Sequence, residues 1–228
     1  MIKKMIPLMA ILSLLSITAG AEPLLQLYIE GATYDNDSES WMFNSLSPLR
    51  LWAIGNVDGP GGKGTLYDVR LAIAYNDPSG PAPVFTLNSS TTGGYNGVTD
   101  PSTPGAAVLS GLPVTDGSSP TLHGGGSLAP HGIYGTGTHW QEFKLGDFSL
   151  TDSPIADFNG TTNFPAAGDF TPNAGQINVY EVSFTGTGVE WLHFDLYGYY
   201  IRNNGSHQSV FAPFSHDGHT VHTPEPAT

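Results

Sequence analysis

The sequence contains no cysteine among its 228 residues. This absence excludes disulfide bonds, a thiolate nucleophile and every cysteine-based zinc site. It also excludes a lipid anchor attached through a cysteine. The folded chain must therefore be held together by its apolar core, by hydrogen bonds and by any ions that it binds.

Basic residues are also scarce. The chain has seven Lys and Arg against 20 Asp and Glu, which gives a formal net charge of −13 at pH 7. Two of the seven, Lys3 and Lys4, lie near the N-terminus, so the rest of the chain is more acidic still. Nucleic acids and anionic membrane surfaces bind to clustered Lys and Arg, and this charge therefore excludes both as direct partners. It is compatible with cations and with neutral glycans.

Helical periodicity is missing beyond the first 21 residues. Glycine (29) and proline (18) are abundant instead, as short strands joined by turns require. Apolar and polar residues alternate with the period of a strand in LLQLYIE (24–30), LRLWAI (49–54), LYDVRLAIAY (66–75), WQEFKLGDFSL (140–150), INVYEVSF (177–184) and EWLHFDLYGYY (190–200).

Segment 66–75 shows the alternation most clearly. One face carries Tyr67, Val69, Leu71, Ile73 and Tyr75, opposite Asp68 and Arg70. This pattern is typical of a strand with one buried face. The sequence therefore predicts an all-β protein, with a single β-sandwich of the jelly-roll kind over residues 22–215.

Residues 76–132 interrupt the pattern. They are rich in Gly, Pro, Ser and Thr, contain neither Lys nor Arg, and have only brief apolar stretches. Such a composition buries little apolar surface, so we expect a long low-complexity loop with one or two weak edge strands. A binding loop is the alternative interpretation.

The first 21 residues have the organisation of a secretory leader. Lys3 and Lys4 precede an apolar run from Met5 to Ala19, which is shorter than the ~20 residues that span a bilayer. Ala19 and Ala21 are the small residues that signal peptidase recognises. We expect cleavage after Ala21 and export of a chain that begins at Glu22.

Five segments resemble one known family. They are GATYDNDSESW (31–41), LWAIGNVDGPGGKGTLYDV (51–69), PHGIYGTGTHWQEFKLGDFSLTDSPIADF (130–158), GQINVYEVSFTGTGVEWLHFDLYGYY (175–200) and FAPFSHD (211–217). Together they are similar to the choice-of-anchor N proteins, which are exported bacterial proteins of unknown ligand. Members commonly end in a PEP-CTERM sorting signal, which is a Pro-Glu-Pro motif, an apolar span and a basic cluster that an exosortase processes.

The end of the chain matches the start of such a signal at Pro224, Glu225 and Pro226. The apolar span and the basic cluster do not follow, so the resemblance implies that the native chain continues past Thr228. We expect residues 216–228 to form a disordered linker. The resemblance further implies a Gram-negative-type bacterium, a cell-surface or extracellular location, and membrane contact that is only transient, through the tail.

Two groups of side chains are candidate ion ligands. Asp35, Asp37 and Glu39 alternate as calcium ligands do, although Ser40 and Leu46 replace the glycine and the bidentate glutamate of an EF-hand loop. A weak Ca²⁺ site and a solvated acidic turn are both open interpretations. His216, His219 and His222 would share one edge of a polyproline II segment, where they could bind a transition metal, but we expect them to belong to the polar linker.

No motif indicates catalysis. GPGGKGT (59–65) lacks the glycine spacing of a phosphate-binding loop, and HGGGS (123–127) has no Gly-x-Ser-x-Gly partner. The sequence therefore favours a non-enzymatic, surface-destined structural or binding protein, with an extracellular polysaccharide as candidate ligand. The alternatives are a secreted glycan-active enzyme and a calcium-dependent carbohydrate-binding module.

Overall fold

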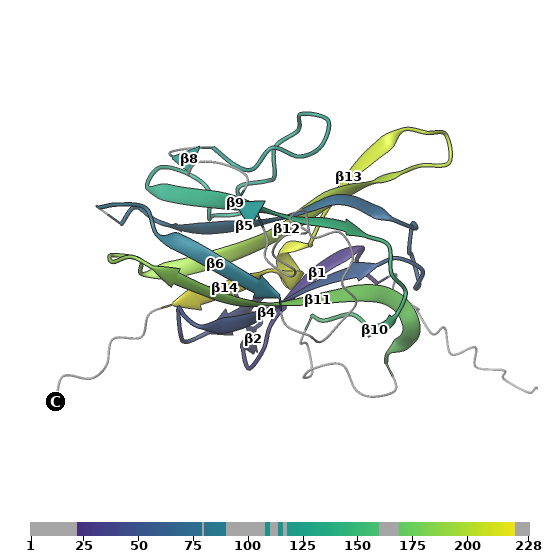
Figure 1. The fold of residues 1–228 in the computed structure, drawn as a ribbon, viewed down its shortest axis with the longest axis horizontal. Coiled ribbons are helices and arrows are strands. Elements are labelled where there is room, and N and C mark those ends of the chain that lie inside the picture. Colours follow the sequence, from purple (N-terminus) through teal and green to yellow (C-terminus); the bar gives the residue numbers. More distant parts are fainter. Residues whose placement is uncertain are drawn as a thin grey trace, which may run out of the picture.

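The protein is a sandwich of two β-sheets, shown in Figure 1 as a computed structural model. The structure describes residues 22–78, 80–89, 108–109, 114–115, 118–159 and 169–221. Within these residues the only helical element is a single 3₁₀ turn, η1 (Phe214–His216). Nor does this part of the chain contain a helix that is long and apolar enough to span a membrane. The predicted all-β sandwich is confirmed.

Among the described residues, the smaller sheet has five strands. Its order is β1 (Leu25–Ile29), β4 (Leu49–Asn56), β11 (Thr171–Thr185) and β10 (Ser153–Ile155), and β6 (Val84–Ser89) also pairs with β11. Every pair in this sheet is antiparallel. The long strand β11 connects the other members, because it pairs with β4, β6 and β10.

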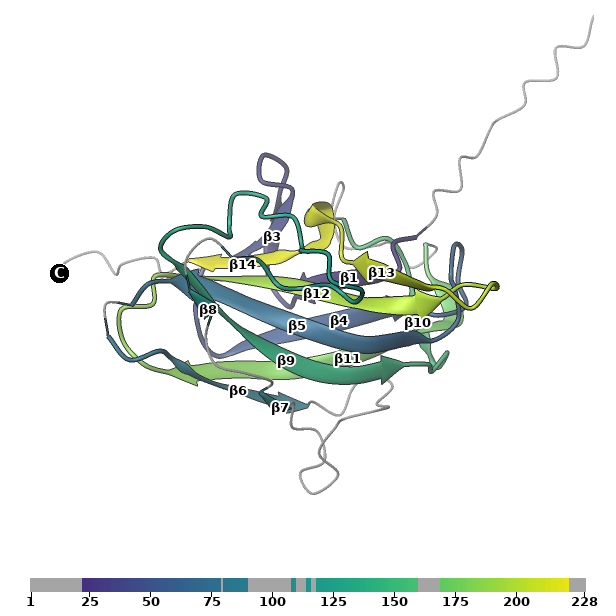
Figure 2. The same cartoon turned by 90° about the horizontal axis from the view of Figure 1, so that it is seen from above.

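The larger sheet has nine strands in the part of the chain that the structure describes. Its order is β2 (Thr33–Asp35), β3 (Ser40–Phe43), β14 (Gly218–Val221), β12 (Trp191–Ile201), β5 (Leu66–Asn76), β9 (Thr138–Phe148) and β7 (Val108–Leu109), with β13 (His207–Phe211) on β12 and β8 (Val114–Thr115) on β9. The pair of β14 and β3 is parallel and the other pairs are antiparallel. Figure 2 shows β12, β5 and β9 lying across β4 and β11.

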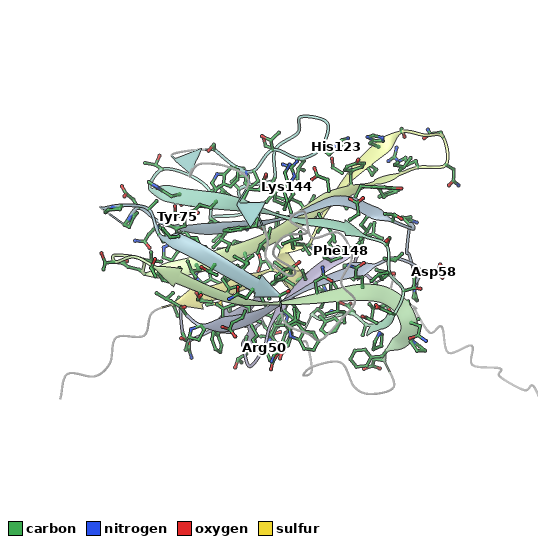
Figure 3. The ribbon with its side chains drawn as sticks, in the orientation of Figure 1. Arg50, Asp58, Tyr75, His123, Lys144 and Phe148 are labelled. Carbon is green, nitrogen blue, oxygen red and sulfur yellow. The ribbon has the colours of Figure 1, made fainter. Side chains whose placement is uncertain are left out.

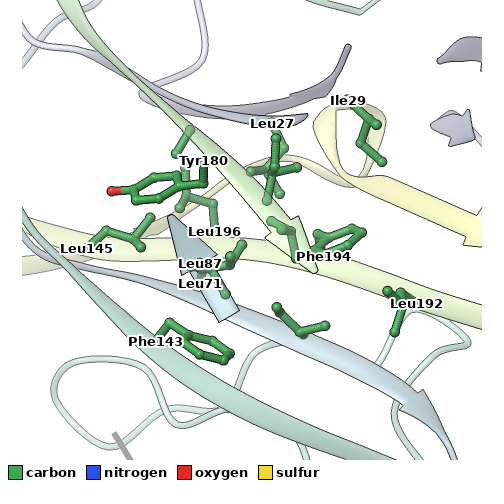
Figure 4. Packing of buried hydrophobic residues seen from close by; sticks show 14 of the residues in the cluster. Leu27, Ile29, Leu71, Leu87, Phe143, Leu145, Tyr180, Leu192, Phe194 and Leu196 are labelled. Atoms are coloured by element: carbon green, nitrogen blue, oxygen red, sulfur yellow. The ribbon is translucent and has the colours of Figure 1, made fainter. Parts of the chain in front are cut away.

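The core lies between the sheets. Tyr75 and Phe148, labelled in Figure 3, are fully buried there. Figure 4 shows Leu71, Phe194 and Leu196 of the larger sheet packed near Leu27 and Tyr180 of the smaller one. Alternation along each strand brings these side chains to one face, as the sequence predicts.

The predicted face of β5 is correct except at its first residue. Val69, Leu71, Ile73 and Tyr75 are in the core, whereas Tyr67 is half-buried and points away from it. The cause is a register shift between Leu66 and Val69, where Asp68 has a φ of 47°. One inserted residue changes which side chains face inward, so Leu66 takes the core position instead.

One predicted boundary is wrong. The strand β14 pairs with both β12 and β3, which extends the fold to Val221, past the predicted domain end at 215. In segment 76–132, where we expect a long loop with one or two weak edge strands, residues 84–89 form β6 and residues 118–132 have a defined path over the larger sheet. In both places an existing sheet supplies the hydrogen-bond partners and the apolar surface that the segment lacks by itself. Residues 1–21 and 222–228 lie outside the described residues.

Segment 118–137 forms a cover on the outer face of the larger sheet. Leu128 and Tyr134 of the cover pack against Ala72, Trp140 and Tyr197 of the strands beneath. His193, Asp195 and Tyr197, which point outward from β12, are therefore buried as well. The cover is therefore a third layer of the fold. It encloses buried polar side chains between itself and the larger sheet, in addition to the apolar core between the two sheets.

The contact of β4 with β11 allows no added methyl group at Gly175. A Cβ there would lie 2.4 Å from the carbonyl oxygen of Gly55 and 2.5 Å from Cγ2 of Ile155. We expect Gly175→Ala to cost about 1–3 kcal/mol of unfolding free energy, as overpacking does. The melting temperature should fall by roughly 2–12 °C. Gly126→Ala is the control, since a Cβ there meets nothing within 4 Å. Equal melting curves for the two variants would contradict this packing.

Candidate metal centre

Four ionisable side chains meet beneath the cover. They are His131 from segment 118–137, His193 and Asp195 from β12, and Asp217 from the link between η1 and β14. His193 and Asp195 are two residues apart on one strand, so both point to its outer face. His131 comes from the cover above this strand, and Asp217 directly precedes β14, which pairs with it.

The ligand atoms of these side chains all lie within 4.8 Å of one another. The two Nε2 atoms of His131 and His193 are 2.9 Å apart. Nε2 of His193 lies 3.4 Å from Oδ2 of Asp195 and 3.5 Å from Oδ2 of Asp217. The four side chains are only 2–8% exposed. We call this group the His2Asp2 cluster.

These separations are close to those around one metal ion. Ligand atoms about 2.0–2.1 Å from a tetrahedral zinc ion are about 3.3 Å from one another. Nε2 of His131 lies 3.5 Å from Oδ1 of Asp195 and 4.0 Å from Oδ2 of Asp217. Small movements of Asp217 and the two imidazoles would bring all four atoms onto one ion.

Neighbouring groups orient two of the four candidate ligands. Nδ1 of His131 lies 2.7 Å from the carbonyl oxygen of Ala129, which can only accept a hydrogen bond. Nδ1 therefore carries the proton, and the lone pair of Nε2 faces the cluster. The hydroxyl of Tyr134 donates to Oδ2 of Asp195 at 2.6 Å. Such outer hydrogen bonds accompany nearly all metal-binding histidines and carboxylates.

The two carboxylates are buried with little positive charge to balance them. Among the described residues, their ion-pair partners are the two histidines. Burial, reinforced by Asp195 and opposed by His193, raises the pKa of Asp217 to about 7. Burial alone would raise the pKa of Asp195 too, but His193, His131 and Tyr134 together hold it below its usual value.

The two histidines respond oppositely to the same surroundings. Burial disfavours the charged form of His193, but Asp195 and Asp217 outweigh it and raise its pKa. For His131 burial dominates over the attraction of Asp195, so its pKa is lowered. The negative charges of the two buried carboxylates are costly unless they are paired, and a divalent cation would neutralise both carboxylates at once.

A cavity of about 480 Å³ opens beside the cluster. His219 on β14 is part of its wall, and burial together with nearby His193 lowers its pKa to about 4, so its imidazole is neutral at neutral pH. The wall otherwise consists of cluster members His131, His193 and Asp217 with Asp35, Ser38, Ser40, Met42, Ile133 and Phe214.

The predicted calcium ligands do not come together. Asp35, Asp37 and Glu39 lie at the β2–β3 turn, not in an extended segment, so their alternation does not place them on one face. The carboxylate of Asp35 accepts hydrogen bonds from the backbone amides of Asp37 and Ser38. Within the described part of the chain, the His2Asp2 cluster is the one group of three or more converging ligands. Of the predicted three, only Asp35 reaches the cavity wall.

The expectation that the tail histidines belong to a polar linker is wrong for His216 and His219, and these two do not share one edge either. His216 is buried in η1 and pairs with Asp157, whereas His219 lies on β14. His222 falls outside the described residues, as do Ala19 and Ala21 of the leader and the motif Pro224, Glu225 and Pro226.

The sequence held one signal of the cluster. His193 and Asp195 occupy the polar face of a predicted strand, and their spacing alone places them side by side. Nothing in the sequence indicated that a cover would bury them, or that His131 and Asp217 would join them.

Comparison with known proteins does not identify the centre. No protein-family model matches the chain, and no curated protein matches it either. The chemistry of the site must therefore be inferred from its own residues.

Proposed function

We propose that this protein is an exported metal-binding protein whose His2Asp2 cluster holds one divalent transition ion, with Zn²⁺ as the first choice. The observation that carries the proposal is the convergence of four buried ligand atoms, two of them carboxylate oxygens, to which no Lys or Arg of the described residues is paired. Imidazole and carboxylate donors in a four-coordinate arrangement suit zinc.

The ion would have a structural role. It joins the cover, the central strand β12 and the C-terminal strand β14, which are far apart in the chain. Four protein ligands complete a tetrahedral shell, whereas catalytic zinc keeps one position open for water. In a chain without cysteine, such an ion gives the cross-link that a disulfide would give elsewhere. A non-enzymatic protein is the function that fits this arrangement.

Export and surface sorting remain part of the proposal, and the sequence supports them. The leader-like residues 1–21 direct the chain to signal peptidase. The resemblance to choice-of-anchor N proteins and the motif at 224–226 suggest an exosortase-type enzyme as second partner. An acidic, metal-stabilised sandwich outside the cell would then present its surface to an extracellular polysaccharide.

The orienting tyrosine offers a specific test of the site. We expect Tyr134→Phe to weaken Zn²⁺ binding about 10–100-fold, because it removes the hydrogen bond that holds Asp195. Zinc affinity would be measured by competition with a chromophoric chelator. Tyr200→Phe, further along β12, is the matched control. Equal zinc affinity in Tyr134→Phe and wild type would contradict the assignment of Asp195 as a ligand.

A further inference from the structure

The cover carries a second histidine that faces another imidazole. Nε2 of His123 lies 2.7 Å from Nδ1 of His207 on β13, and both rings are exposed. Figure 3 labels His123 beside the end of the β12–β13 hairpin. This pair is separate from the His2Asp2 cluster, since none of its members is among the four ligands.

An aromatic side chain holds both rings in place. Tyr199 on β12 stacks on His123, with ring centres 3.8 Å apart and planes 19° from parallel. The same tyrosine stacks on His207 at 4.9 Å and 24°. Ser209 fixes the backbone of the cover here, because its hydroxyl donates to the carbonyl oxygen of His123. The two imidazoles are therefore positioned by neighbours on two strands, although they are exposed to water.

We propose that His123 and His207 form a second, exchangeable metal site, which takes Cu²⁺ in preference to other first-row ions. Nitrogen donors about 2.0 Å from a square-planar ion, at neighbouring corners, are about 2.8 Å apart. The observed 2.7 Å between the two nitrogens is close to that spacing. Among divalent first-row metals, Cu²⁺ has the highest affinity for such donors.

Binding needs only a local rearrangement of the pair. Without metal, one ring donates an N–H to the other, so only one of the facing nitrogens has a lone pair, and that lone pair accepts the hydrogen bond. When an ion binds, that proton moves to the other nitrogen of its ring, where water can accept a hydrogen bond. Each ring then rotates, so that the lone pairs of the two facing nitrogens both point at the ion. The ion lies to one side of the line that joins these two nitrogens. Water molecules complete the coordination.

The site differs from the buried cluster in lability and in charge. It supplies two neutral donors at an exposed position, so its ion exchanges with solution faster than one enclosed by four buried ligands. The net charge of −13 raises the local concentration of cations near the protein surface. An ion here would fasten the cover to β13, as His131 fastens it to β12.

The test is a Cu²⁺ titration of the metal-free full chain, followed by electron paramagnetic resonance. We expect wild type to bind two equivalents, and His207→Ala and His123→Ala to bind one. His207→Gln is a sharper variant, because glutamine can still hydrogen-bond to His123 but gives no imidazole ligand. It should lose the second equivalent as well. His139→Ala, which removes a histidine beside Asp77, should bind as wild type does.

The variants separate this inference from the proposed function. If His207→Gln and His207→Ala keep the full wild-type stoichiometry, the exposed site does not exist and the pair is only a hydrogen bond. If His193→Ala instead keeps the full wild-type stoichiometry, the buried centre is refuted, whereas the exposed site is not. Loss of the second equivalent in His139→Ala would also overturn the assignment, because it would show adventitious binding by any histidine. The resonance of the second Cu²⁺ should show coupling to two nitrogens.

Discussion

Saturating Zn²⁺ is expected to raise the melting temperature of the metal-free protein by roughly 8–16 °C. An ion that binds only the folded state stabilises it by about 4.1 kcal/mol when its free concentration is 1,000 times Kd. For a domain of this size each kcal/mol corresponds to roughly 2–4 °C. The effect is large because the ion relieves two buried carboxylates and joins three segments of the fold. Differential scanning calorimetry with Zn²⁺ and with chelator measures it.

Asp217→Asn is the informative control for this prediction. The amide has nearly the same shape as the carboxylate but carries no charge, so the variant should lose the zinc effect. Without metal it should melt at the same temperature as wild type or higher, because one of two buried like charges is gone. Saturating Ca²⁺ should have a much smaller effect than Zn²⁺, since Asp35, Asp37 and Glu39 do not converge. A variant that keeps the full zinc shift would contradict Asp217 as a ligand.

Phe194→Ala is expected to lower the free energy of unfolding by about 3–5 kcal/mol, as the removal of a large core side chain does. Phe194 is fully buried between the two sheets and lies on the inner face of the strand that carries the cluster. The melting temperature should fall by roughly 6–20 °C. Urea titration gives the free energy directly.

An exposed phenylalanine provides the comparison. Phe211 on β13 is 39% exposed, so Phe211→Ala should change the free energy of unfolding by well under half of the Phe194 effect. Similar losses in the two variants would show that the space between the sheets is not the main core. Loss of zinc binding in Phe194→Ala at temperatures where it remains folded would indicate that core and centre are coupled through β12.

The strands could be predicted from the sequence because their signal is local. All six segments with period-two alternation are strands in the structure, as the inner face of β12 illustrates with Leu192, Phe194 and Leu196. Where the prediction failed, the cause was not local. Tyr67 faces away from the core, and not into it as predicted, because a single-residue bulge precedes Val69. The strand β14 forms because β3 and β12 leave a gap of one strand between them.

The candidate centre could be predicted only in part, for the same reason. His193 and Asp195 share a strand face, and that much follows from their spacing. His131 is 62 residues away from His193, in a segment whose composition predicted a loop. Its position depends on the apolar contacts of Tyr134 and Leu128 with the sheet, which appear only when the strands are assembled. The alternation of Asp35, Asp37 and Glu39 was misleading because a turn interrupts it.

Anomalous X-ray diffraction at the zinc edge, from crystals of the zinc-loaded chain, tests the buried centre most directly. We expect one strong peak about 2.0–2.2 Å from Nε2 of His131, Nε2 of His193 and one oxygen each of Asp195 and Asp217. A zinc-loaded crystal with no peak among these four side chains, or with its ion bound elsewhere, would contradict the buried metal centre.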